Sequence, residues 1–213
     1  MDNAKKFFNT LIDQGYLGIQ EMIGKEENLF LDFKEKKDTS KSGIDQEDKR
    51  NYVKALSGFS NSSGGVLVWG IKAKKLNADS PDVAIGEKPI SNLKKFITDL
   101  NSLVSDAMQP LNSEIQNVPI YIPEQDDIGF VITYVPECDL LPVRALLGVN
   151  QYYSRIGDSF IMMEHYMLAD MFGKRQKPKL EIFYSIQGGG GGQRRQLKII
   201  FGIKNIGDRK SVV

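Results

Sequence analysis

The pattern of hydrophobic and polar positions predicts a helical start to the chain and then a strand. Over residues 1–24, apolar residues recur at helical spacing until Gly15 interrupts them, which predicts a short helix and a second turn. Residues 29–37 alternate with a period of two, as a strand does. One face of this strand is apolar, and the other carries Phe30, Asp32, Lys34 and Lys36.

A helix and a glycine turn are expected after the polar loop 38–43. Asp45 can cap the helix because its side-chain oxygen can accept hydrogen bonds from the first free backbone N–H groups. The helix is expected to end at Phe59–Ser60, ahead of a polar turn and the pair Gly64–Gly65. A buried strand over residues 66–71 follows, so helix, turn and strand together predict a core element.

The hydrophobic pattern predicts no regular element directly after this strand, but it predicts a helix and several strands further along the chain. Residues 72–90 are polar and are expected to be irregular. Ser91 is expected to cap a helix with an apolar stripe that ends at Ala107. The remaining predictions are strands over 115–122, 129–135 and 152–163, the last broken near Gly157, and a closing helix over 164–174.

Pro178 marks the expected domain boundary. Two apolar segments follow it and are predicted to be antiparallel strands joined by the run Gly188–Gly192. Because two strands alone make at best a marginal domain, they either pair with the first sheet or begin a truncated β-sandwich, which we favour. We therefore expect an α/β (α+β) domain over 1–177, with a mixed sheet flanked by helices, and a β-rich segment over 178–213.

Composition narrows the class of protein. The 213 residues are 41% hydrophobic and 26% charged, which is ordinary for a globular protein, and the net charge of +1 provides no global field toward nucleic acid. No apolar run reaches the roughly 18 residues of a membrane span, and the N-terminus lacks a secretory signal, so we expect a cytoplasmic location and no membrane partner. A single cysteine and a single histidine exclude an internal disulfide and Cys- or His-rich metal sites.

Two clusters carry candidate chemistry. Glu27 and Asp32, beside lysines, can hold a divalent cation and a phosphodiester, although the same pattern fits the solvent-exposed polar face of an edge strand. In YYSRIGDSF (152–160), Tyr153 and Arg155 can stack on a base and grip a phosphate, or Tyr153 can fill the core while Arg155 pairs with an acid. Phosphate-loop and nucleophile-elbow motifs are absent, so ATPase and serine-hydrolase functions are not expected.

Three segments in fixed order resemble the Schlafen-type AlbA domain. They are ENLFLDFK (27–34), LSGFSNSSGGVLVWGI (56–71) and YYSRIGDSF (152–160). In that family the segments typically read E-S-x-x-x-E-F-K, A-F-A-N-T-x-G-G with an apolar strand and G-[IV], and Y-x-R-x-G-S. The resemblance covers about residues 20–175. It implies an α/β fold and nucleic-acid binding, often within larger bacterial regulatory or defence proteins.

The resemblance also implies which residues form the site. Some eukaryotic relatives are metal-dependent RNases that cut tRNA and rRNA with three acids, of which two correspond to Glu27 and Asp32. The third lies just after the glycine-turn strand, where this chain has Ala73 between lysines, with Asp79 or Asp82 as late substitutes. The expected nucleic-acid-binding residues are Lys34, Lys36, Asn61, Lys72, Lys74, Tyr153 and Arg155.

Three functions remain open on the sequence. The first is a module that binds RNA or DNA without cutting it, and the second is a ribonuclease that uses Mg²⁺ or Mn²⁺ at Glu27 and Asp32. The third is a protein-interaction or assembly module. A homodimer and a downstream domain are further expectations, and no cofactor is certain.

Overall fold

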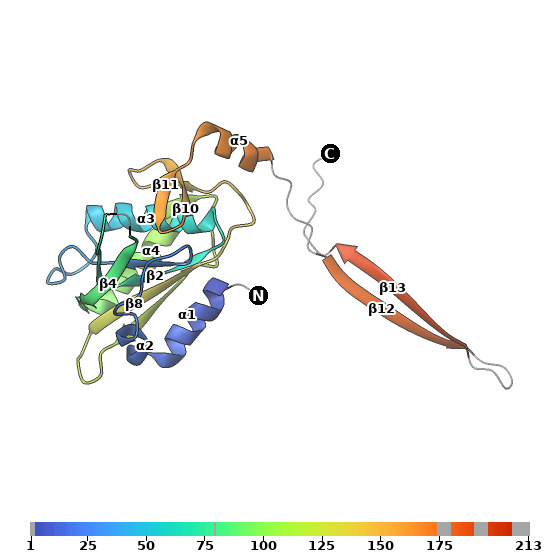
Figure 1. The fold of residues 1–213 in the computed structure, drawn as a ribbon, viewed down its shortest axis with the longest axis horizontal. Coiled ribbons are helices and arrows are strands. Elements are labelled where there is room, and N and C mark those ends of the chain that lie inside the picture. The colour runs from blue at the N-terminus through green and yellow to red at the C-terminus, as the bar shows by residue number, and fades with distance from the viewer. Residues whose placement is uncertain (1–2, 79, 174–179, 190–195, 206–213) are drawn as a thin grey trace. The chain divides into compact units, whose positions relative to one another are not determined.

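The computed structural model describes residues 3–78, 80–173, 180–189 and 196–205 (Figure 1). The chain forms two compact units, Met1–Gly173 and Lys174–Val213. The helices of the first unit are α1 (Asn3–Gln14), α2 (Tyr16–Gln20), α3 (Gln46–Ser60), α4 (Leu93–Ala107) and α5 (His165–Gly173). Its strands are β1 (Leu31–Lys34), β2 (Gly65–Trp69), β3 (Ile71–Lys75), β4 (Asp82–Glu87), β5 (Ile90–Ser91), β6 (Met108–Gln109), β7 (Gln116–Tyr121), β8 (Ile128–Val135), β9 (Arg144–Ala145), β10 (Gln151–Ile156) and β11 (Ser159–Met162).

A mixed sheet forms the centre of the first unit, as the sequence predicted. Its strand order is β1-β2-β8-β5, and β7 also pairs with β8. The β1–β2 pair is parallel, whereas β8 runs antiparallel to β2, β5 and β7. A smaller sheet has the order β11-β10-β9-β6, and β10 of this sheet packs against α3.

Helices cover both faces of the central sheet, and β2 shows why. Leu67 and Trp69 point into a core with α3 and α4, whereas Val66 and Val68 point into a second core with α1 and α2. The side chains of a strand alternate between the two faces, so a strand buried on both sides is apolar throughout. Figure 1 shows α1 and α2 on one side of the sheet and α3 and α4 on the other. No helix within the described ranges is long and apolar enough to cross a membrane.

One of the two predicted helix caps is confirmed and the other is wrong. Asp45 caps α3, where its side chain accepts from the backbone N–H groups of Glu47 and Asp48. Ser91 does not cap α4, because the residue before that helix is Asn92, which makes no side-chain cap bond. Asp127, distant in sequence, accepts from the first N–H groups of α4 instead.

Two further expectations about local structure are wrong. Residues 72–90 are not irregular, because β3 and β4 pair as an antiparallel hairpin within them. The first strand ends at Lys34 and does not reach residue 37. Lys36 lies beyond it, almost fully buried, and its ammonium donates to the backbone carbonyl of Lys41.

The second unit contains the two strands that the sequence predicted, β12 (Leu180–Gly189) and β13 (Gln196–Asn205), paired antiparallel. Most of the connecting glycine run lies outside the described residues. The pairing register places exposed apolar side chains together on one face: Leu180, Ile182, Tyr184, Ile186, Ile199, Phe201 and Ile203. The β-sandwich assignment of this unit stays a prediction.

Gly64 and Gly65 join α3 to β2 for different physical reasons. Gly64 has a φ of 74°, which side chains rarely tolerate. Gly65 has an ordinary backbone, but a Cβ there would lie 2.1 Å from Cε1 of Phe59, inside the ring's van der Waals radius. The turn therefore brings the strand directly against the last turn of the helix.

We predict that Gly65→Ala lowers the free energy of unfolding by about 1–3 kcal/mol or more, because the packed ring of Phe59 must move. Gly86→Ala is the matched control in another strand, since a Cβ at Gly86 meets no atom within 4 Å. Urea unfolding measures both changes. Equal stabilities for the two variants would contradict the close approach.

Candidate nucleic-acid interface

The two predicted acids converge, but they are buried. Asp32 lies on β1 with 1% of its surface exposed, and Glu27 lies just before the strand with 6% exposed. Leu31 and Phe33 point into the core with α1 and α2, so Asp32 points to the opposite face of the sheet. β1 is an edge strand of the central sheet, but the solvent exposure expected for its polar face is wrong for these two side chains.

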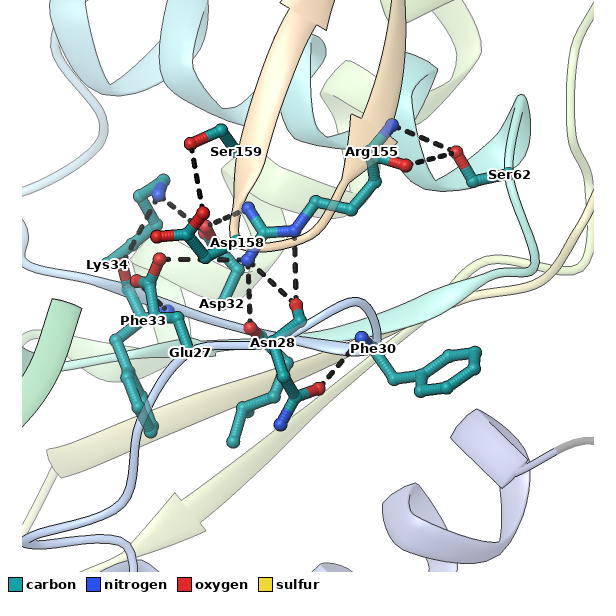
Figure 2. A network of polar contacts seen from close by, with 11 residues as sticks. Glu27, Asn28, Phe30, Asp32, Phe33, Lys34, Ser62, Arg155, Asp158 and Ser159 are labelled. Atoms are coloured by element: carbon teal, nitrogen blue, oxygen red, sulfur yellow. Dashed lines mark hydrogen bonds and ion pairs between the residues drawn. The ribbon is translucent and has the colours of Figure 1, made fainter. Parts of the chain in front are cut away.

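Arg155 of β10 covers this face of β1 (Figure 2). Its Nη1 donates to Asp32 Oδ1 at 2.8 Å, and its Nη2 donates to the carbonyl oxygens of Asn28 and Leu31, each at 3.0 Å. The guanidinium also lies 4.4 Å from the centre of the Phe160 ring. Arg155 is only 3% exposed, so the structure shows the second arrangement considered from the sequence, in which Arg155 pairs with an acid.

The second carboxylate oxygen of Asp32 contacts Lys34. The ammonium of Lys34 lies 2.5 Å from Asp32 Oδ2, and about a fifth of the Lys34 side chain is exposed. Basic groups therefore contact both oxygens of Asp32. A metal ion at Asp32 would have to displace at least one of them, and each displaced charge would need another partner.

The surroundings of Glu27 favour the protonated form of its carboxyl group. Burial, reinforced by the nearby charge of Asp32, raises the pKa of Glu27 from 4.5 to about 8. One oxygen accepts from the backbone N–H of Phe33 at 2.9 Å, and the other lies 3.6 Å from Arg155 Nη2. A cation that binds Glu27 would therefore have to displace a proton that burial favours, because a metal ligand must be ionised.

No third acid joins the pair within the described part of the chain, where no three Asp, Glu, His or Cys residues are placed to hold a metal. Ala73 pairs with Ala84 in the β3–β4 hairpin. The backbone carbonyl of Asp82 accepts from the Glu27 N–H at 2.8 Å, but its carboxylate completes no such group. Asp79 lies outside the described residues. The donors present do not fit a Mg²⁺ or Mn²⁺ site.

Two other residues that were predicted to bind nucleic acid are buried and form hydrogen bonds within the protein. Asn61, 4% exposed, donates to the carbonyls of Val143 and Tyr153 at 2.7 and 2.8 Å and accepts from the Val143 N–H. Burial lowers the pKa of Lys36, which is 2% exposed. Their role in binding stays a prediction, and these contacts favour a structural role for both.

Exposed basic side chains remain around the acid pair. Lys72 and Lys74 are exposed on β3, and Tyr153 is half-buried on β10. Two cations that the sequence analysis did not single out, Arg50 and Lys54, line a pocket beside Tyr153. Their spacing of four residues on the predicted helix could have indicated a shared face, but nothing local indicated the pocket.

Comparison with known proteins confirms the resemblance. The family model "Schlafen, AlbA_2" matches residues 27–164, more than half of the chain. The chain therefore belongs to the Schlafen AlbA_2 family. Its three motifs are the segments that bring Asp32, Ser62 and Arg155 together, since Ser62 Oγ accepts from the Arg155 backbone N–H at 2.9 Å.

One similar solved structure is the NMR structure of the N-terminal domain of a RecG-related protein from Nitrosomonas europaea. It is 18% identical, and the alignment covers 78% of this chain and 97% of that chain with a TM-score of 0.44. No curated protein matches the chain.

We predict that Glu27→Gln flattens the pH dependence of stability. The Glu27 carboxyl keeps its proton up to about pH 8 in the folded state but loses it near pH 4.5 in the unfolded state. Its contribution to the free energy of unfolding is therefore largest below pH 4.5. It then declines as pH rises toward 8, by on the order of 1 kcal/mol per unit. Urea unfolding across this range measures the slope.

Glu26→Gln is the matched control, because Glu26 is the exposed neighbour of Glu27. It should leave the pH slope of the parent protein unchanged. If Glu27→Gln and Glu26→Gln gave the same slope, Glu27 would titrate as an ordinary exposed carboxyl, and the account of a buried, protonated group would be wrong.

Proposed function

We propose that the first unit is a nucleic-acid-binding module that holds RNA or DNA through its phosphate backbone and does not cut it. One observation carries this proposal. Asp32, the acid on which a metal site would depend, is neutralised by Arg155 and Lys34, while Lys72 and Lys74 stay exposed on β3, a strand that contacts β1. Membership of the Schlafen AlbA_2 family supports a ligand of this class.

The exposed lysines lie on a hairpin whose backbone is hydrogen-bonded to the first motif. The Gly70 N–H, just before β3, donates to the Lys34 carbonyl at 2.8 Å. At the other end of the hairpin, Asp82 of β4 lies opposite Lys75 of β3, and the backbone carbonyl of Asp82 accepts from the Glu27 N–H. The β3–β4 hairpin therefore lies along the first motif, and it carries Lys72 and Lys74 on its exposed surface. Such a local positive patch can bind phosphates even though the net charge is only +1.

We expect the protein to bind a labelled oligonucleotide or tRNA at low salt and to lose affinity steeply as salt rises, because binding releases counterions. The double variant Lys72→Gln/Lys74→Gln should bind more weakly. The slope of log affinity against log salt concentration should be smaller in magnitude by about 0.7–0.9 for each lost phosphate contact. Fluorescence anisotropy measures both quantities.

The control for this experiment removes the same charge elsewhere. Lys6 of α1 and Lys94 of α4 are exposed, so Lys6→Gln/Lys94→Gln should retain the affinity and salt dependence of the parent protein. Absence of any binding at low salt would overturn the proposed function. Equal losses in both double variants would show only a nonspecific charge effect.

The ribonuclease alternative is tested on the same protein. We expect tRNA incubated with Mn²⁺ and the protein to stay intact, because the donors at Glu27 and Asp32 do not fit the metal. Cleavage that disappears in Asp32→Asn, while a thermal melt shows that the variant is folded, would establish the nuclease and contradict our proposal. Cleavage that Asp32→Asn leaves unchanged would point to a contaminating enzyme.

The protein-interaction alternative is favoured by the apolar face of β12 and β13. Seven apolar side chains are exposed on one side of a two-stranded ribbon, which is unusual for a surface facing water. If this face forms the predicted homodimer, sedimentation velocity should show a dimer that Tyr184→Glu/Phe201→Glu converts to a monomer. Glu181→Gln, on the opposite face, is the control. A monomeric parent protein would leave this alternative without support.

A further inference from the structure

A polar pocket of about 410 Å³ lies between α3 and the segment that leads into β10. Its lining residues are Arg50, Asn51, Lys54, Gly148, Val149 and Tyr153. None of these except Tyr153 belongs to a family motif that the sequence analysis used. The volume falls within the range of small-ligand sites, roughly 300–1,000 Å³.

Arg50 and Lys54 give the pocket a positive wall. They stand four residues apart on α3, so they share one face of the helix. Neither of them forms an ion pair with a carboxylate among the residues that the structure describes. By contrast, the partly buried Lys34 and Lys88 each contact a carboxylate. Two cations that make no ion pair within the described ranges, placed in a concave site, favour an anionic ligand.

Lys54 is held at the pocket at an electrostatic cost. Its ammonium lies 5.4 Å from the centre of the Tyr153 ring, which favours a cation at that position. Burial lowers the pKa of Lys54, and the neighbouring charges of Lys34 and Arg155 lower it further, although Asp32 acts in the opposite direction. An anion bound here would relieve this repulsion.

The rest of the lining can hold the other parts of a nucleotide. Val149 and the ring of Tyr153 supply an apolar surface against which a sugar or base can pack. The side-chain amide of Asn51 can donate to a phosphate oxygen or pair with a base edge. Gly148 borders open space, since a Cβ there would meet no atom within 4 Å. A base inside a duplex is stacked between its neighbours, so a pocket of this kind suits an unpaired base.

We propose that this pocket binds one nucleotide unit of a single-stranded nucleic acid, with its phosphate between Arg50 and Lys54 and its sugar and base against Val149 and Tyr153. The inference rests on the proposed function and adds to it the strandedness of the ligand and a defined contact point. The cations on β3 then hold a neighbouring part of the same strand.

The test measures the affinity of the whole chain for a fluorescein-labelled single strand of about 10 nucleotides, within the usual site size of such modules. Lys54→Gln and Arg50→Gln should each weaken binding about tenfold or more, because each removes a charged hydrogen bond to phosphate. Tyr153→Leu should also weaken binding, while changing the salt dependence little, because it removes packing and no charge.

Matched controls separate the pocket from general charge and stability. Lys49→Gln removes a charge from the same helix outside the pocket, and Tyr152→Leu removes the neighbouring ring, which packs on Phe172. Both should bind like the parent protein. Thermal melts should show that every variant is folded, and a duplex of the same sequence should bind more weakly than the single strand.

The outcomes distinguish the pocket from the proposed function. If the parent protein binds the strand and the pocket variants bind equally well, the pocket proposal falls while the proposed function stands. If uridine monophosphate binds as tightly as the strand, the pocket is a small-molecule site and our assignment is wrong. If the parent protein binds no nucleic acid, both proposals fall.

Discussion

The buried pair between Asp32 and Arg155 is the interaction on which the arrangement of the first unit depends. It joins β1, from the start of the domain, to β10, more than a hundred residues later. Ser62, in the turn after α3, holds the backbone of Arg155, so the pair also ties the glycine turn to both strands. Removing one partner of such a pair typically costs about 3–5 kcal/mol, because the other charge stays buried alone. This dependence gives the three family motifs a common structural purpose.

The same pair is the main observation behind our proposal that the first unit binds nucleic acid without cutting it. A carboxylate that neutralises an arginine and a lysine cannot also neutralise a divalent cation without releasing one of them. Glu27 adds to this effect because its raised pKa favours the protonated form, so that a cation binding there would have to displace a proton. Exposed or half-buried positive charges lie on β3 and α3, and positive charge beside a half-buried tyrosine suits a nucleic-acid strand. The geometry therefore supports binding more strongly than it supports cutting.

The sequence predicted those parts of the fold that local chemistry determines. The Asp45 cap and the strand after Gly64–Gly65 follow from residues close together in the chain, and both are present. The Ser91 cap is absent because a distant residue, Asp127, supplies the hydrogen bonds instead. The β3–β4 hairpin was missed because the apolar alternation of β3 is short and weak, with only Ile71 and Ala73 among lysines.

The candidate site was predicted less completely, because burial of charge depends on tertiary structure. Sequence patterns treat charged residues as exposed, yet Lys36 and Arg155 are buried and bonded to backbone carbonyls. The sequence predicted that Glu27 and Asp32 belong to the site. It left open whether Arg155 binds phosphate or pairs with an acid, and the structure shows that Arg155 pairs with Asp32. Arg50 and Lys54 could not be identified from the sequence, because their pocket depends on the distant segment around Gly148, which lines its other side.

The most direct test of this account is an amide NMR titration of the isotope-labelled protein with paramagnetic Mn²⁺, which broadens signals near a bound ion. If Arg155 and Lys34 neutralise Asp32, the amide signals of Asp32 and Phe33 should be no more sensitive to Mn²⁺ than those of the rest of the chain. Selective broadening of these signals at low Mn²⁺, lost in Asp32→Asn, would show that the acid pair binds a metal and would contradict the account.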